Sequence, residues 1–77
     1  MKAYVLIHVR PGSVPEVVRN LRRIKGVIEA NMTFGPYDVV AVIEVANFNA
    51  LGPLIAAEVQ PIPGVIDTLT CLVVEPA

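Results

Sequence analysis

Several residue types that commonly carry chemistry are scarce in this sequence. It has one cysteine, Cys71, one histidine, His8, and no tryptophan, and charged residues make up 17% of its 77 positions. One cysteine cannot form an internal disulfide or a cysteine-based metal site. The sequence also has no P-loop, no G-x-G-x-x-G and no metal ligands at a recognisable spacing. We therefore expect no metal, no cofactor and no enzymatic activity.

Long apolar runs and an excess of one charge are also missing. No segment approaches the about 18 uninterrupted apolar residues of a membrane span, and the N-terminus has a strand pattern rather than a signal-peptide pattern. Six lysines and arginines against seven acidic residues give a net charge of −1, which provides no general attraction to nucleic acid. We expect a soluble, cytoplasmic protein that binds neither membranes nor nucleic acid directly.

Apolar residues, by contrast, are abundant. Hydrophobic residues make up 55% of the sequence, and its mean hydropathy is +0.65. We expect residues 1–77 to form one domain, and a domain of this size buries only about 60% of the surface that its unfolded chain exposes. The apolar surface that remains predicts self-association.

The spacing of the apolar residues predicts four strands and two helices. The expected strands span residues 2–10, 27–34, 37–46 and 65–75, with a Gly35–Pro36 turn between the second and the third, and the expected helices span residues 13–24 and 47–60. Ser13 and Glu16 predict a capping box for the first helix, and Asn47 predicts an N-cap for the second. Gly52–Pro53 predicts that the second helix bends or begins late.

An internal repeat supports the order βαββαβ. The segment I-K-G-V-I-E at residues 24–29 returns as I-P-G-V-I-D at residues 62–67. Two βαβ halves of similar length are typical of a ferredoxin-like α+β sandwich of the dimeric α+β barrel type. We expect a four-stranded antiparallel sheet with both helices on one face.

The expected strands are apolar on both faces. The first strand places Val5, Ile7 and Val9 on one face, and Tyr4, Leu6 and His8 on the other. A sheet with helices on one face and water on the other should alternate apolar and polar residues. The apolar second face therefore predicts a homodimer packed sheet against sheet.

Two isolated residues have simple structural interpretations. His8 lies in the middle of a strand, and no second titratable group stands at a recognisable spacing from it, so a hydrogen-bonded structural histidine is favoured over a catalytic base. Cys71 is favoured as a buried small apolar residue over a reactive thiol. The arginines of the first helix are most simply its solvated face.

Two further groups of residues are candidates for ligand binding. The turn Gly35-Pro36-Tyr37-Asp38 is either a tight hairpin turn or an aromatic wall with a carboxylate, suited to an ammonium group. Thr68 and Thr70 are two residues apart and share a strand face. They either reflect strand propensity or offer two hydroxyls to a polar ligand.

The segments I-K-G-V-I-E-A, F-G-P-Y-D-V-V and I-P-G-V-I-D-T-L-T together resemble a known family. The chain is similar, over essentially its whole length, to the ligand-binding (RAM) module of the leucine-responsive regulator/AsnC family, which regulates transcription of amino-acid metabolism. The resemblance implies amino-acid effectors, sheet-to-sheet dimers and an octamer of four dimers. It further implies that Gly35, Tyr37 and Asp38 contact the effector, with Thr68 and Thr70 as secondary candidates.

The resemblance also has a consequence for assembly. Full-length relatives carry an N-terminal helix-turn-helix domain, whereas the first strand here begins almost at Met1. We expect a stand-alone module without its own DNA-binding domain, which joins full-length regulators in mixed assemblies.

Three alternatives remain open from the sequence. A small ferredoxin-like monooxygenase or isomerase would need a pocket between sheet and helices that holds His8 beside a second polar group. An ACT-type regulatory domain has the same element order and also binds amino acids. A structural oligomerisation module would bind no ligand.

Overall fold

A computed structural model describes residues 1–75 of the chain. Its elements are β1 (Lys2–Val9), α1 (Val14–Arg22), β2 (Val27–Met32), β3 (Val39–Glu44), α2 (Phe48–Leu54), the π-helical segment η1 (Ile55–Val59) and β4 (Val65–Leu72). The predicted order βαββαβ is confirmed, and most elements are one to three residues shorter at their ends than the sequence pattern indicates.

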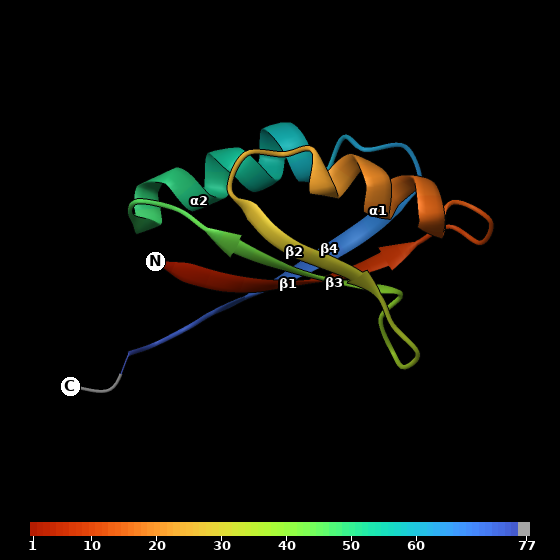
Figure 1. The fold of residues 1–77 in the computed structure, drawn as a ribbon, viewed down its shortest axis with the longest axis horizontal. Coiled ribbons are helices and arrows are strands. Elements are labelled where there is room, and N and C mark those ends of the chain that lie inside the picture. Colours follow the sequence, from red (N-terminus) through yellow and green to blue (C-terminus); the bar gives the residue numbers. More distant parts are fainter. Residues whose placement is uncertain (76–77) are drawn as a thin grey trace.

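The sheet is antiparallel, with the strand order β2-β3-β1-β4. Both helices cover the same face of the sheet, and no element covers the other face within residues 1–75 (Figure 1). This arrangement confirms the ferredoxin-like fold. The core lies between the sheet and the helices, and its most deeply buried large side chains are Val5, Ile7, Val17, Leu21, Val39, Ile43 and Val59.

The two helix starts differ in how they are capped. Asn47 has extended backbone angles, and its side-chain oxygen accepts a hydrogen bond from the Ala50 amide at 3.2 Å, which confirms the predicted N-cap. The capping box predicted for Ser13 is wrong, because Ser13 makes no side-chain cap bond. Its backbone is already in the helical region (φ −103°, ψ −2°), whereas a capping serine needs extended angles to reach the next amides.

The second helix begins immediately after Asn47 and continues through Pro53. Proline has no amide hydrogen, so the helix loses one bond there. Two residues later the helix widens into the π turn η1, in which the Gln60 amide donates to the Ile55 carbonyl at 2.9 Å. The late start that Gly52–Pro53 predicted as one alternative is therefore wrong, and the irregularity observed is a change of helix type just beyond Pro53.

The internal repeat forms the same turn twice. Gly26 and Gly64 have φ angles of +104° and +100°, a region that favours glycine. Each glycine lies in a turn closed by the following valine, because Val27 donates to Ile24 and Val65 donates to Ile62, both at 3.1 Å. In each half of the fold, the chain therefore passes from the helix into the next strand through the same type of glycine turn.

The face of the sheet away from the helices, here called the open face, is apolar over its centre. Opposite residues in the strand register place these side chains together: Tyr4, Leu6, Val40, Val42, Leu69 and Cys71. Tyr4 is 40% exposed and Leu69 is 50% exposed. The prediction that Cys71 is buried is wrong, because β4 is an edge strand and this face has no cover.

No helix within residues 1–75 is long and apolar enough to span a membrane.

Candidate functional site

The loop between β2 and β3 carries three of the five predicted site residues and is longer than expected. β2 ends at Met32 and β3 begins at Val39, so residues 33–38 replace the predicted two-residue turn. Thr33 closes the loop, because its amide donates to the Asp38 carbonyl and its hydroxyl to the Tyr37 carbonyl. Gly35 is exposed at the tip with φ +144°. The loop projects to the side opposite the helices (Figure 1).

Tyr37 and Asp38 are held against the end of β1. The Asp38 amide donates to the Ile7 carbonyl at 3.0 Å, and Asp38 Oδ2 accepts a hydrogen bond from the Val9 amide at 2.7 Å. The Tyr37 ring stacks on His8 with centroids 4.4 Å apart and an interplanar angle of 14°. The loop therefore has the structural role of a hydrogen-bonded turn, one of the two interpretations of its sequence. The second carboxylate oxygen of Asp38 can accept a hydrogen bond from a further donor.

His8 links this loop to β4. Its Nε2 lies 2.8 Å from the Pro36 carbonyl oxygen, and its Nδ1 lies 2.7 Å from Asp67 Oδ1. The Pro36 carbonyl and the Asp67 carboxylate raise the pKa of His8 above its ordinary value of 6.5. The prediction of a hydrogen-bonded histidine is confirmed.

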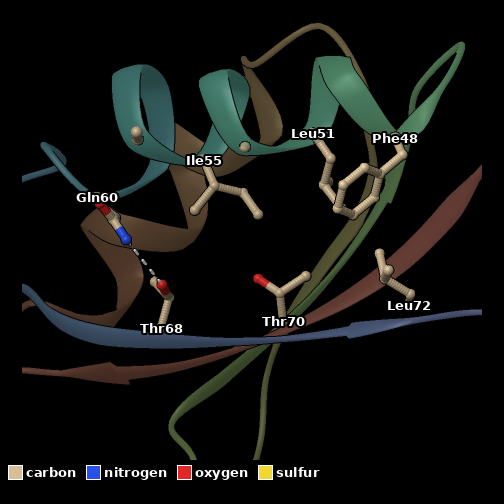
Figure 2. Close-up of a pocket in the computed structure, with 9 residues that line it drawn as sticks. Phe48, Leu51, Ile55, Gln60, Thr68, Thr70 and Leu72 are labelled. Atoms are coloured by element: carbon tan, nitrogen blue, oxygen red, sulfur yellow. Dashed lines mark hydrogen bonds between the residues drawn. The ribbon is translucent and has the colours of Figure 1, made fainter.

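Thr68 and Thr70 line a separate groove between β4 and the second helix (Figure 2). Its volume is about 460 Å³, within the range of small-molecule sites. Phe48, Leu51 and Ile55 point down from the helix, and Thr70 and Leu72 point up from the strand (Figure 2). None of the nine lining residues is charged: Phe48, Leu51, Gly52, Ile55, Ala56, Gln60, Thr68, Thr70 and Leu72.

The polar groups of the groove lie on its floor and at one end. The hydroxyls of Thr68 and Thr70 face the helix, and the Gln60 amide nitrogen is 3.4 Å from the Thr68 hydroxyl. A bound molecule would therefore meet hydroxyl and amide groups on one side and aliphatic and aromatic carbon on the other. Such a surface can orient a polar head while it shields an apolar tail from water.

The helical half of this groove was not predicted from the sequence. Phe48, Leu51 and Ile55 fit the apolar stripe of a helix, and such a stripe indicates packing alone. The signal that could have identified the groove is Gly52, because a glycine within a helix leaves space where other residues place a side chain. Apart from its chain neighbours and the backbone of its own helix, a Cβ atom at Gly52 would meet no atom within 4 Å.

The five predicted residues do not form one site within the chain. The loop with Gly35, Tyr37 and Asp38 lies on the open side, whereas Thr68 and Thr70 pair with Ile7 and Val5 on the helix side. The sheet stands between the two sets. A single small ligand that contacts both sets must lie between two copies of the chain.

The sequence matches the family model described as "Lrp/AsnC ligand binding domain" over residues 2–77. The chain belongs to this family. As an Lrp/AsnC ligand-binding domain it is 35% identical, over 75 residues, to the HTH-type transcriptional regulator FL11 of Pyrococcus abyssi. The match covers 97% of this chain and 49% of FL11, so the chain spans about half the length of the curated relatives it matches.

Solved structures share the fold of this Lrp/AsnC domain. TTHA0845 from Thermus thermophilus aligns with a TM-score of 0.92 and 26% identity, over 99% of this chain and 95% of that chain. The transcriptional regulator NMB0573 from Neisseria meningitidis, described as a complex with L-Met, aligns with a TM-score of 0.86. Its identity is 17%, over 96% of this chain and 49% of that chain, so this likeness concerns the fold alone.

The family assignment and the geometry also bear on the enzyme alternative. The matching family model describes a domain that binds ligands, and FL11 is a transcriptional regulator. The enzyme alternative required His8 in a pocket between the sheet and the helices. His8 instead lies on the open face, paired in register with Asp67, and it is not among the residues that line the groove.

Proposed function

We propose that this chain is an amino-acid sensor and assembly module in transcriptional regulation. The observation that carries the proposal is the groove between α2 and β4, because it combines polar groups on its floor with apolar walls in a ligand-binding family. The walls suit an apolar side chain, and the hydroxyls of Thr68 and Thr70 suit the carboxylate of an amino acid. The L-Met in the structure of the Neisseria regulator is a ligand of that kind.

The ammonium group of the ligand requires a partner that the groove does not provide. An ammonium ion taken from water into a partly apolar site must be paired with an acceptor, best a carboxylate. Asp38 has one carboxylate oxygen held by Val9, and the other is available for an ammonium group. Since the loop and the groove lie on opposite sides of one sheet, we place the amino acid between the groove of one copy and the loop of another.

The open face supports assembly through the sheet. Tyr4 and Leu69 remain 40% and 50% exposed at its centre. Full burial of a large apolar side chain contributes about 1.5–3 kcal/mol, so a second copy of the same face gives a substantial gain. We propose a homodimer through this face, dimers that gather into an octamer, and mixed assemblies with full-length regulators.

The assembly is tested by placing a charge on the open face. Leu69→Asp should convert dimers to monomers in sedimentation at micromolar protein, because a buried unpaired carboxylate is costly. Met32→Asp is the matched control, since Met32 is 62% exposed but pairs with Val39 on the helix side and does not line the groove. Dimers that persist in Leu69→Asp contradict assembly through this face.

Ligand binding is tested with two substitutions at Gly52. Purified protein is screened against the twenty amino acids by thermal shift, in which a ligand at 100 times its dissociation constant stabilises its binding state by about 2.7 kcal/mol. Gly52→Leu should fill the groove and remove the response. Gly52→Ala should keep the response, because one methyl group leaves most of the groove open. Its basal stability should change little, because the usual gain from alanine within a helix is offset by the clash of a Cβ atom with the ring of Pro53.

The outcomes separate the sensor from a purely structural module. A response in wild type and Gly52→Ala that is lost in Gly52→Leu supports binding in the groove. A response that survives in Gly52→Leu places the ligand elsewhere, and no response to any amino acid refutes amino-acid sensing. Loss of response in Asp38→Asn, with the assembly unchanged, supports the role of this carboxylate.

A further inference from the structure

The single histidine joins three separate segments of the chain at one end of the open face. His8 on β1 contacts the Pro36 carbonyl at 2.8 Å, Asp67 Oδ1 on β4 at 2.7 Å and the Tyr37 ring at a centroid distance of 4.4 Å. Pro36 and Tyr37 belong to the loop that carries Asp38. His8 therefore holds the Pro36–Tyr37 part of the loop to the sheet, next to Asp38, whose carboxylate is bound to the Val9 amide.

The two hydrogen bonds require a particular protonation state. A carbonyl oxygen and a carboxylate oxygen both accept hydrogen bonds, so each ring nitrogen of His8 must donate one. Only the imidazolium form carries both N–H groups. The Pro36 carbonyl, the Asp67 carboxylate and the nearby charge of Asp38 all favour this form and raise the pKa of His8.

Loss of the proton has an unequal effect on the two bonds. The neutral ring keeps one N–H group, and a bond to a carboxylate is stronger than a bond to a neutral carbonyl. The ring therefore keeps Asp67 and turns a lone pair toward the Pro36 carbonyl, which repels it. The stacking on Tyr37 weakens as well, because the attraction of a cation for the ring face disappears.

The two carboxylates that face His8 act in the same direction on its protonation. Asp67 approaches from β4, and Asp38 and Tyr37 approach from the loop. Both carboxylates stabilise the imidazolium, and the loop bond depends on it. Deprotonation thus removes the hydrogen bond from the His8 ring to the Pro36 carbonyl, while the hydrogen bond to Asp67 on β4 remains.

We propose that His8 is a positioning residue that clamps the Pro36–Tyr37 part of the loop to the sheet when it is protonated and releases this part when it is neutral, while Asp38 stays bound to β1 through its amide and its carboxylate. The clamp sets the position of Tyr37, the residue next to the carboxylate that would face the ligand, so this proposal rests on the proposed function for its biological meaning. Effector binding should then weaken as the pH rises through the pKa of His8. The clamp itself is a property of the protein without any ligand.

The experiment follows the loop and the ring by NMR in the absence of amino acids. The His8 ring signals and the backbone amide signals of Tyr37 and Asp38 are recorded from about pH 5 to about pH 9, a range that spans the ordinary histidine pKa. The protein concentration is one at which sedimentation gives the same mass at both ends. We expect the loop amides to shift with the same midpoint as the ring, above pH 6.5.

Asp67→Asn distinguishes a protonation-dependent clamp from ordinary packing. An asparagine amide can donate to Nδ1 of a neutral ring, which leaves Nε2 free to donate to the Pro36 carbonyl. The neutral form then makes both bonds, so the loop amides should lose their pH dependence and stay near their low-pH positions. His8→Phe keeps an aromatic ring without either bond, and its loop amides should match wild type at high pH throughout.

Each result decides the proposal. Loop shifts that track the ring in wild type and vanish in Asp67→Asn support the clamp. Loop shifts that do not follow the ring, or that persist unchanged in Asp67→Asn, overturn it. Because no amino acid is present, failure of the clamp is distinct from failure of amino-acid sensing, which the thermal-shift screen tests separately.

Discussion

Gly64 provides the sharpest test of how the two halves of the fold meet. An alanine Cβ at this position would lie 2.6 Å from Ser13 Cβ, 3.1 Å from Ser13 Oγ and 3.2 Å from Val17 Cγ2. Neither side can move easily, because the Gly64 carbonyl accepts a bond from Arg10 at 2.7 Å and the Ser13 carbonyl accepts one from Val17 at 3.0 Å. We expect Gly64→Ala to be strongly destabilising.

The magnitude follows from separate contributions. The left-handed backbone at φ +100° costs an alanine about 1–2 kcal/mol, and the reduced freedom of the unfolded chain offsets roughly 0.4–1 kcal/mol. Displacing packed groups around the added methyl costs about 1–3 kcal/mol more. The free energy of unfolding should therefore fall by roughly 1–5 kcal/mol in Gly64→Ala, with about 3 kcal/mol at the centre of the range.

Gly12 is the matched control for the backbone contribution. Its φ is +87°, but a Cβ there would meet no atom within 4 Å, so Gly12→Ala should lose only about 1 kcal/mol. Urea denaturation followed by circular dichroism, at one fixed protein concentration, gives both values. Adding Ser13→Gly to Gly64→Ala should recover part of the loss, because it removes the nearest atoms. Equal losses in the two alanine variants would show that the predicted contact with Ser13 is absent.

Two further predictions concern the helix caps and the pH. Asn47→Ala should lower the free energy of unfolding by about 1 kcal/mol in urea denaturation, whereas Ser13→Ala should change it little, because only Asn47 makes a side-chain cap. The pKa of His8 is raised on folding, so its contribution to stability is complete below pH 6.5 and is lost as the pH rises through the folded pKa. The urea midpoints of wild type and His8→Phe should converge as the pH increases, and a constant difference contradicts this.

The fold was predictable because several local signals agree with one another. The stripe of α1, the apolar run of β1 and the repeated Ile-x-Gly-Val turn each indicate the same element order. The end of β2 was not predictable, since Thr33 and Phe34 continue a strand pattern. Hydrogen bonds of Thr33 and Asp38 across the loop stop the strand, and such contacts leave no periodic signal in the sequence.

The candidate site was predictable only in part, and for a similar reason. Tyr37 and Asp38 stand out because aromatic and charged residues are scarce, and Thr68 and Thr70 because they share a strand face. The position of Thr68 and Thr70 on the opposite side of the sheet from Tyr37 and Asp38 depends on the strand pairing between β1 and β4. The contact of His8 with Pro36 spans 28 residues and that with Asp67 spans 59, so the clamp is invisible before the chain is folded.

The separation of groove and loop leads to a test that a site within one chain cannot pass. Gly52→Leu blocks the groove and leaves the loop intact, while Asp38→Asn alters the loop and leaves the groove intact. Each variant alone should fail to bind an amino acid. When the two are unfolded together and refolded as mixed assemblies, random pairing joins an intact groove to an intact loop at about a quarter of the sites.

Binding restored at that level, measured by calorimetry, requires that the two halves come from different copies. If one chain formed the whole site, every chain in the mixture would carry a defect and no binding would return. Refolded wild type checks that the procedure preserves binding, and each variant refolded alone checks that neither recovers by itself. The same mixture separates assembly from sensing. Mixed assemblies that have the normal mass but bind no amino acid would support the assembly module and refute a binding site shared between copies.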